Sequence, residues 1–531
     1  MSSRAGAFRP PNSILIIGSG VFGLSTALQL IQQREFAKTS ITILDRSPEP
    51  GVFTARDASS IDSSRIIRAD YSDPAYARLA AEAAQHWRRQ GPGELGGEGR
   101  YTESGLFLVA NQDGTPGLGY VQKSWINAIA LANAEGGRGP ESVRLAAYPH
   151  QLQLMVPNAG VFGDWGYLND SSGWADATKS MRWLYEKVVA TGRVRFINGT
   201  ASRLDLQTPI FALPGVVDHK PRVSGAILED GTKLLADLTI VATGAWTPSL
   251  LDLQGQAVAT GQIVAYLDIT EEEQVRLNNF PVLLNFSSGY FIIPPRDRCL
   301  KIAQHSYGYL NPTEVPTPLG MADKSAAATL DKLTETLKTT SIKEATHAPP
   351  NAPSKLAGTA SGTVKVSKPR THLTHPPATP TTSHLPPDAE AGLRAALKQF
   401  LPWMSDTETR PFSQTRLCWY TDTSTGDWIM DYHPSYSGLF VATGGSGHAF
   451  KFLPVLGEKV VSCLKGQYPA DFESKWRWRG TPGQGDGDAE RTIMKGDGSR
   501  GGVPGLVLAN ELARKTTKTG SGTSSVEKAS L

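Results

Sequence analysis

Five short segments of this chain have residue types and spacing that suit cofactor binding and catalysis. Residues 18–23 (GSGVFG) form a glycine-rich turn, and residues 62–68 (DSSRIIR) hold two arginines. Residues 300–305 (LKIAQH) place a lysine in an apolar run. Residues 416–427 (RLCWYTDTSTGD) contain a cysteine and are followed by the glycine-rich run 444–451 (GGSGHAFK). Glycine-rich turns bind phosphates, whereas cations and a thiol suit anion binding and covalent chemistry.

The glycine turn is flanked by the elements that a dinucleotide site needs. Residues 13–17 (SILII) predict a buried parallel strand, and residues 21–33 have apolar side chains at helical spacing. A second strand is expected at 41–44, ending at Asp45. This β–turn–α–β pattern predicts a bound dinucleotide.

Each glycine of the turn has a physical role in that prediction. Gly18 permits the tight turn, Gly20 lets the backbone approach a pyrophosphate, and Gly23 lets the helix pack on the strand. The pyrophosphate would meet free N–H groups at the helix N-terminus. The Asp45 carboxylate is placed for the hydroxyls of an adenosine ribose, which disfavours NADP. The turn alone does not distinguish FAD from NAD.

The other segments resemble an enzyme family that uses FAD. Residues 62–68, 173–176 (GWAD), 242–246 (ATGAW), 300–305 and 416–451 are similar to segments of FAD-dependent amine oxidases of the monomeric sarcosine oxidase and fructosyl amino acid oxidase family. Residues 418–427 are most similar to fungal saccharopine and L-pipecolate oxidases. The resemblance covers residues 12–310 and 400–470. It implies an α/β fold with a Rossmann-like FAD-binding domain of the glutathione reductase type and a second, mixed-sheet α+β substrate domain.

The resemblance also implies roles for individual residues. Cys418 would carry FAD through a covalent 8α-S-cysteinyl bond, and Lys301 would stabilise superoxide as it forms from O2. The catalytic residues would be Lys301, Arg65 and His448, and the substrate-binding residues would be Arg68, Lys451 and Tyr420. The cofactor-binding residues would be Gly18, Ser19, Gly20, Val21, Gly23, Asp45, Arg46, Ser64, Arg65, Cys418, Gly445, Ser446, Gly447, Phe450 and Lys451.

Each of these residues also has an interpretation without chemistry. Lys301 would then be solvent-exposed, and Arg65 and Arg68 would lie on a surface loop. Cys418 would be a small buried apolar residue, and His448 a hydrogen-bonded core histidine. The sequence leaves these alternatives open.

The implied reaction is oxidation of the C–N bond of a secondary or cyclic amino acid of the saccharopine, pipecolate or N-alkyl type. Hydride passes to the flavin, an imine forms, and O2 is reduced to H2O2. A tailoring flavoenzyme whose imine is trapped intramolecularly, a flavin dehydrogenase, a fructosyl amino acid oxidase and a non-catalytic flavin-binding protein are the alternatives. The fructosyl substrate ranks lower because no arginine lies near Gly426.

The chain divides into segments that we expect to alternate between two domains. Further strands are expected at 239–242 and 439–443, a hairpin at 291–302, and helices at 73–90, 171–190, 453–464 and 503–512. The FAD-binding domain is expected at 12–104, 168–260 and 425–479, the substrate domain at 105–167, 261–321 and 389–424, a disordered insertion at 322–388, and a flexible C-terminal tail at 480–531.

Composition excludes several classes of function. The net charge of +3 gives no reason to expect a nucleic-acid partner. Three cysteines argue for a reducing compartment and against a disulfide framework, and none has metal-ligand spacing. No run of about eighteen apolar residues predicts a membrane span. We expect a monomer that is cytoplasmic, or peroxisomal if residues 529–531 (ASL) act as a targeting signal.

Overall fold

A computed structural model describes most of the 531-residue chain. The described residues are 8–46, 56–134, 136–207, 220–321, 362–372, 374–375, 385–404, 406–407, 409–479 and 497–514. Most of the predicted insertion 322–388 and the tripeptide 529–531 lie outside them. Within the described residues, no helix is long and apolar enough to span a membrane, and no cluster of side chains is suited to hold a metal ion.

A six-stranded sheet carries the glycine turn. Its strand order is β21-β22-β13-β1-β2-β9, and neighbouring strands are parallel except for β21 and β22. Such sheets are buried on both faces, which explains the continuous apolar runs. The bounds are β1 (Ser13–Ile17), β2 (Ser40–Asp45), β9 (Val194–Asn198), β13 (Leu238–Val241), β21 (Ile429–Tyr432) and β22 (Leu439–Thr443).

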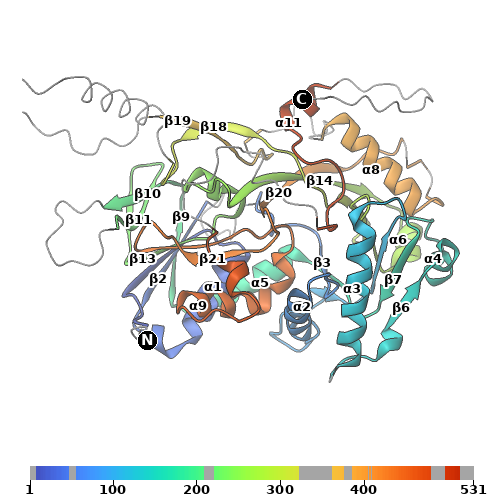
Figure 1. The fold of residues 1–531 in the computed structure, drawn as a ribbon, viewed down its shortest axis with the longest axis horizontal. Coiled ribbons are helices and arrows are strands. Elements are labelled where there is room, and N and C mark those ends of the chain that lie inside the picture. The colour runs from blue at the N-terminus through green and yellow to red at the C-terminus, as the bar shows by residue number, and fades with distance from the viewer. Residues whose placement is uncertain are drawn as a thin grey trace, which may run out of the picture.

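Helices cover one face of this sheet and a smaller sheet covers the other. Ile14 and Ile16 of β1 pack into the same apolar cluster as helical residues, whereas Leu15 and Ile17 pack with strands on the opposite face. Figure 1 shows β2 and β13 on the left, with α1 and α9 in front of them. The elements are α1 (Val21–Gln32), α5 (Ala177–Ala190), α9 (Leu453–Leu464), β10 (Ala201–Gln207), β11 (Arg222–Leu228) and β12 (Lys233–Leu235).

An eight-stranded mixed sheet forms the second unit. Its strand order is β20-β14-β17-β16-β15-β5-β7-β6, with one parallel pair, β15 and β5. Figure 1 shows β6, β7 and α3 on the right. The bounds are β5 (Leu106–Ala110), β6 (Val143–Ala146), β7 (Trp165–Asn169), β14 (Ala257–Asp268), β15 (Val282–Asn285), β16 (Tyr290–Arg296), β17 (Cys299–Gln304) and β20 (Gln414–Thr423).

The alternation of side chains along this sheet decides which residues can meet. Leu417 and Trp419 of β20 belong to the apolar cluster that includes α8 (Pro387–Phe400). Cys418 and Tyr420 belong to the opposite cluster, which includes α3 (Pro116–Asn133). Strand β14 lies between β20 and β17, where its Gln262 pairs with Cys418 and its Tyr266 with Lys301. The pleat therefore brings β17 and β20 side chains to one face.

Shorter elements connect and support the two sheets. Helix α2 begins after Asp73, whose side chain accepts a hydrogen bond from Ala75 N at 2.8 Å. The remaining elements are α2 (Pro74–Trp87), α4 (Pro149–Met155), α6 (Glu271–Leu277), α10 (Glu473–Trp476), α11 (Leu508–Ala513), η1 (Arg34–Phe36), η2 (Pro140–Ser142), η3 (Gly244–Ser249), η4 (Ala449–Phe452), β3 (Arg65–Ile67), β4 (Tyr101–Thr102), β8 (Gly173–Ala175), β18 (Pro312–Pro316) and β19 (Thr363–Ser367).

The two-sheet architecture agrees with the predicted fold class, and the hairpin predicted at 291–302 is β16 and β17. The helix predicted at 171–190 begins only at Ala177, because residues 173–175 form β8 and Asp176 caps the helix by accepting from Lys179 N at 2.9 Å.

Two segments differ from the predicted disorder. Within 322–388, β19 pairs antiparallel with β18. Within 480–531, residues 497–514 have a described fold, and Leu508 is fully buried. Average composition over a long window hides short strand-forming runs such as 363–367 (TVKVS). The boundaries of the predicted domains otherwise stay a prediction.

Candidate functional site

The glycine turn leaves no room for side chains at two of its positions. Gly18 has φ +104°, and a Cβ there would lie 2.5 Å from Ala242 O. A Cβ on Gly23 would lie 1.8 Å from Gly18 O. At Gly20 the nearest atom is Ser60 Oγ at 3.9 Å, and Gly20 lines a cavity. The backbone there is open to a ligand, as a pyrophosphate requires.

Gly23→Ala is expected to lower thermal stability. The added methyl meets the fixed carbonyl of Gly18, so the turn and helix α1 must separate. Overpacking of this kind costs about 1–3 kcal/mol. The melting temperature measures the loss. Gly119→Ala in α3 is the matched control, because a Cβ there meets nothing within 4 Å. A melting temperature for Gly23→Ala equal to wild type would contradict the close approach.

A cavity of ≈ 690 Å³ extends from the glycine turn to the edge of the eight-stranded sheet. This volume is in the range of small-molecule and cofactor sites. Residues of the glycine turn and of the glycine-rich run 444–451, which were both predicted to bind FAD, line this cavity. The cavity therefore fits a dinucleotide in position as well as in volume. The predicted cofactor-binding residues on its wall are Gly18, Gly20, Val21, Asp45, Arg46, Arg65, Gly445, Ser446, Gly447 and Phe450.

Asp45 lies at the end of β2 on the wall of this cavity. Its carboxylate accepts hydrogen bonds from Ser19 N at 2.7 Å and from Ser19 Oγ at 2.5 Å. Burial raises the pKa of Asp45, although Ser19 and Arg46 oppose the rise. Arg46 itself lies over the Trp246 ring at 4.1 Å and pairs with Asp57 at 3.0 Å. These contacts fix the acidic residue where a ribose would lie.

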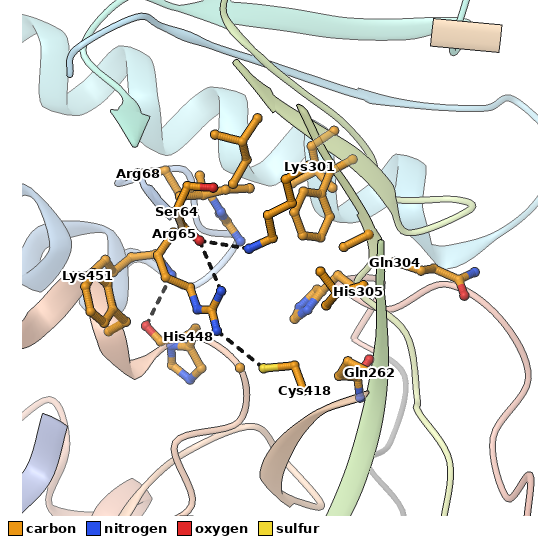
Figure 2. A pocket seen from close by; sticks show the side chains of 18 of the residues that line it. Ser64, Arg65, Arg68, Gln262, Lys301, Gln304, His305, Cys418, His448 and Lys451 are labelled. Carbon is orange, nitrogen blue, oxygen red and sulfur yellow. Dashed lines mark hydrogen bonds between the residues drawn. The ribbon is translucent and has the colours of Figure 1, made fainter. Parts of the chain in front are cut away.

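A second, smaller cavity of ≈ 70 Å³ adjoins the first. The two cavities share wall residues, namely Arg65, Tyr420, Gly447, His448 and Phe450. The smaller one also brings together five further predicted residues, which come from segments distant in sequence (Figure 2), whereas Ser19 and Gly23 line neither cavity. The five residues are Ser64, Arg68, Lys301, Cys418 and Lys451.

Lys301 is a buried cation held by a carboxylate. Its Nζ atom donates to Asp62 Oδ2 at 2.7 Å and to Ser64 O at 2.8 Å, and 3% of the residue is exposed. Burial lowers the pKa of Lys301 to about 8, although Asp62 opposes the shift. The solvent-exposed interpretation of this lysine is therefore wrong.

Asp62 is a site residue that the sequence analysis did not single out. It pairs with Lys301 and with Arg65, and it accepts from Tyr266 Oη at 2.5 Å. Burial opposes its charge, but Arg65, Lys301 and Arg416 together hold its pKa well below the ordinary value. Its position in the 62–68 run, three residues before Arg65, was the available signal.

Cys418 is buried beside a guanidinium. Arg65 Nη2 lies 3.3 Å from Cys418 Sγ, and Figure 2 shows Arg65 pointing toward the sulfur. Cys418 also lines the smaller cavity, which places its sulfur beside any ligand bound there. The arrangement therefore suits a cysteine that attacks an electrophilic carbon, as covalent attachment of FAD requires.

Arg68 and Lys451 bring two buried basic side chains to the smaller cavity. Arg68 is 7% exposed, and its Nη1 atom has no hydrogen-bond partner among the described residues. Lys451 Nζ donates to Tyr71 Oη at 2.9 Å and to His448 O at 3.2 Å. Burial and the nearby Arg68 charge hold the pKa of Lys451 well below its ordinary value. A carboxylate ligand would accept a hydrogen bond from Arg68 Nη1. It would also offset the free-energy cost of burying Arg68 and Lys451.

His448 has both ring nitrogens in contact with partners. Nε2 lies 2.9 Å from Gly426 O, which can only accept, so Nε2 carries the proton. Nδ1 then accepts from Tyr71 Oη at 3.0 Å. Burial and Lys451 hold the pKa of His448 well below its ordinary value, which keeps the ring neutral. The geometry resembles the hydrogen-bonded core histidine more than a free acid or base.

Tyr420 and Gly447 pack tightly where the cavities meet. Gly447 has φ +69°, and a Cβ there would lie 2.3 Å from Tyr420 Cε2. His305, whose ring centroid lies 6.0 Å from that of Tyr420, also lines the smaller cavity. The sequence analysis gave His305 no role.

Comparisons with known proteins agree with the predicted fold and cofactor. The family described as "FAD dependent oxidoreductase" matches residues 13–462. The chain is similar to amino acid oxidase imqH of Aspergillus flavus, at 33% identity over 86% of this chain and 93% of that protein. L-saccharopine oxidase of Schizosaccharomyces pombe is 27% identical over 88% of this chain and 93% of its own length. A crystal structure of a thermally stable fructosyl peptide oxidase mutant aligns with TM-score 0.69 and 25% identity, and covers 96% of this chain and 98% of that one.

Proposed function

We propose that this chain, which belongs to the family of FAD dependent oxidoreductases, oxidises the C–N bond of a secondary or cyclic amino acid and reduces O2 to H2O2. One observation carries the proposal. Two buried basic side chains, Arg68 and Lys451, line a cavity that shares walls with the cofactor-sized cavity. An amino acid whose carboxylate meets these side chains would have its α-carbon beside the cofactor.

The division of labour follows from the positions of the side chains. FAD, when bound, would accept the hydride and pass the electrons to O2. Arg68 offers a planar fork that binds a carboxylate bidentately, and Lys451 adds a point charge. Lys301 lies on a neighbouring part of the same wall, where it would stabilise negative charge that develops on O2. Arg65 and Asp62 hold that lysine and Cys418 in place.

The substrate amine would react in its neutral form. No Asp or Glu is among the described residues that line the smaller cavity, so a carboxylate base is not at hand. Burial and the charges of Arg68 and Lys451 both disfavour a protonated amine beside them. The site therefore lowers the pKa of the amine and needs no strong base.

The cavity wall favours an apolar substrate side chain over a sugar. Phe286, Phe291, Val264, Leu284 and Ile293 contribute apolar surface to it. A polyhydroxyl group would leave hydroxyls without partners against such a wall. The names of the relatives, amino acid oxidase and L-saccharopine oxidase, support an amino acid substrate. The fructosyl peptide oxidase structure supports the shared fold.

Peroxide release from a panel of substrates tests the function. The panel contains pipecolate, saccharopine, sarcosine, N-methylated aromatic amino acids and fructosyl amines. The proposal expects turnover of an N-substituted or cyclic amino acid and little with fructosyl amines. Fast turnover of a fructosyl amine would favour the alternative activity. Flavin reduction by substrate without peroxide formation would favour a dehydrogenase.

Covalent attachment of FAD through Cys418 belongs to the same proposal. Forming the thioether breaks one S–H and one C–H bond and releases two electrons and two protons, which O2 takes up as H2O2. Cys418→Ser is expected to bind FAD that is released by acid precipitation, because an alcohol is a far weaker nucleophile than a thiolate. Cys463→Ala in α9, away from both cavities, should keep its pellet yellow. Flavin that stays in the Cys418→Ser pellet would contradict the linkage.

A further inference from the structure

The segment 497–514, in the C-terminal region, is built into the wall behind the site. Gly501 N donates to His305 O at 3.0 Å, and Leu508 N donates to Leu310 O at 2.8 Å. A Cβ on Gly501 would lie 2.1 Å from Ser288 O. The segment therefore lies beside residues 305–310, which follow β17. At Gly501 the backbone approaches that of Ser288 so closely that a side chain would not fit.

Arg500 is the one described residue of this segment whose charged group reaches the cofactor-side loop. Its side chain is 1% exposed and pairs with Asp422, itself 2% exposed, at 2.8 Å. The same Nη2 atom donates to Ser446 O at 2.7 Å, and Nη1 donates to Ser306 O at 3.1 Å. A buried charge with this many partners links three segments at one point.

Two of the three hydrogen-bond partners of Arg500, Asp422 and Ser446, belong to elements of the candidate site. Asp422 lies on β20, four residues after Cys418, and its other oxygen accepts from Thr260 Oγ1 at 2.6 Å. Ser446 lies in the glycine-rich loop that lines the larger cavity. The guanidinium carbon of Arg500 also lies 5.4 Å from the Tyr420 ring centroid. Arg500 thus contacts the cysteine strand, the loop and the ring between them.

The loop needs external support at Ser446. This residue has φ +45°, a conformation that costs energy for a residue with a Cβ. Ser446 N donates to Thr421 O at 3.0 Å, and its hydroxyl donates to Gly444 O at 2.9 Å. Arg500 supplies the partner for the remaining backbone group, Ser446 O. Without it, a buried carbonyl would lose a charge-assisted hydrogen bond.

The orientation of one peptide unit connects this support to the cavity. In a trans peptide the C=O and N–H groups point in opposite directions, and no described peptide bond is cis. Because Ser446 O points to Arg500, the N–H of Gly447 points away from Arg500, and Gly447 lines both cavities. We propose that Arg500 is a positioning residue that fixes the Ser446–Gly447 peptide, so that its N–H group faces the cofactor. The proposal rests on the proposed location of FAD in the larger cavity.

The test compares full-length variants of this one side chain. Arg500→Gln removes the charge and the fork, Arg500→Lys keeps the charge with a single donor group, and Arg514→Gln is the matched control. Arg514 lies in the same segment, is 60% exposed and pairs with Glu511. Readouts are amide hydrogen exchange of residues 444–449, the visible flavin spectrum and the Kd for sulfite, an anion that adds to oxidised flavin.

The expected results separate positioning from simple stability. Arg500→Gln should increase amide exchange in 444–449 at least tenfold, shift the flavin spectrum and raise the sulfite Kd at least tenfold. Arg500→Lys should give values between those of wild type and Arg500→Gln for all three readouts. Arg514→Gln should match wild type. Wild-type exchange, spectrum and sulfite Kd in Arg500→Gln would overturn the proposal. A colourless wild-type protein would overturn the proposed function, while the exchange measurement would still decide whether Arg500 holds the loop.

If Arg500→Gln fails to fold, a second variant still tests the proposal. Asp422→Asn with Arg500→Gln leaves no lone carboxylate in the interior, so it removes the penalty of an unpaired buried charge. This double variant should fold and show the same fast exchange in 444–449. If both variants were insoluble, the pair would be required for the fold as a whole, and the specific role in the loop would be rejected.

Discussion

Arg68→Met is expected to reduce kcat/KM for a carboxylate-bearing substrate by about thirty-fold to several thousand-fold. Removing one partner of a buried charge pair costs about 2–5 kcal/mol. The structure supports the upper part of this range, because Arg68 is 7% exposed and its Nη1 atom has no partner among the described residues. Methionine keeps much of the side-chain length and places no charge at this position. The loss is expected in KM more than in kcat, since the carboxylate does not react.

A methyl ester of the same substrate tests the specificity of that loss. The ester has no negative charge for Arg68 to bind, so wild type and Arg68→Met should turn it over at similar, low efficiency. Arg144→Met is the surface control, because Arg144 is 47% exposed and pairs with Asp170. An equal loss for the acid and the ester would show that Arg68 supports the fold of the cavity and does not bind the carboxylate.

Lys301→Met is expected to slow reoxidation of the reduced enzyme by O2 by about 10²–10³-fold. This is the usual cost of removing one preorganised group that stabilises charge in a transition state. Flavin reduction by substrate should change much less. Asp62 keeps Arg65 as a partner, so the variant leaves no isolated buried carboxylate. Stopped-flow measurement of the two half-reactions separates them. A loss confined to flavin reduction would contradict the role in O2 activation.

The pH dependence of reoxidation provides an independent check on Lys301. Its pKa is lowered to about 8 by burial. The ammonium group is charged below that pH and loses its proton above it, so the wild-type rate with O2 should fall as pH rises through about 8. Lys301→Met should show no such step, whereas Lys365→Met, at an exposed position of β19, should keep it. A wild-type rate independent of pH between 7 and 9 would contradict the assignment.

Local sequence predicted the parts of this fold that depend on local physics. The turn 18–23, the apolar runs 13–17 and 439–443 and the hairpin 291–302 take the expected forms, because backbone conformation and strand burial are determined by neighbouring residues. Family resemblance added which side chains to look for. It named Arg68, Lys301, Cys418 and Lys451, and the structure brings all four to one cavity.

Long-range contacts decided the rest. Asp62 became the centre of a charge network only when β3, β17 and β20 came together, and nothing in its own segment distinguishes it from a loop aspartate. Arg500 lies in a region whose composition predicts disorder, yet one ion pair with Asp422 anchors it in the interior. Composition averages over many residues, whereas burial of a single charge depends on partners far away in sequence. The chain alone therefore determined its cofactor class and strand pattern. Tertiary packing determined which charges are paired, and it left Arg68 with an unpaired donor atom, among the described residues, on the wall of the smaller cavity.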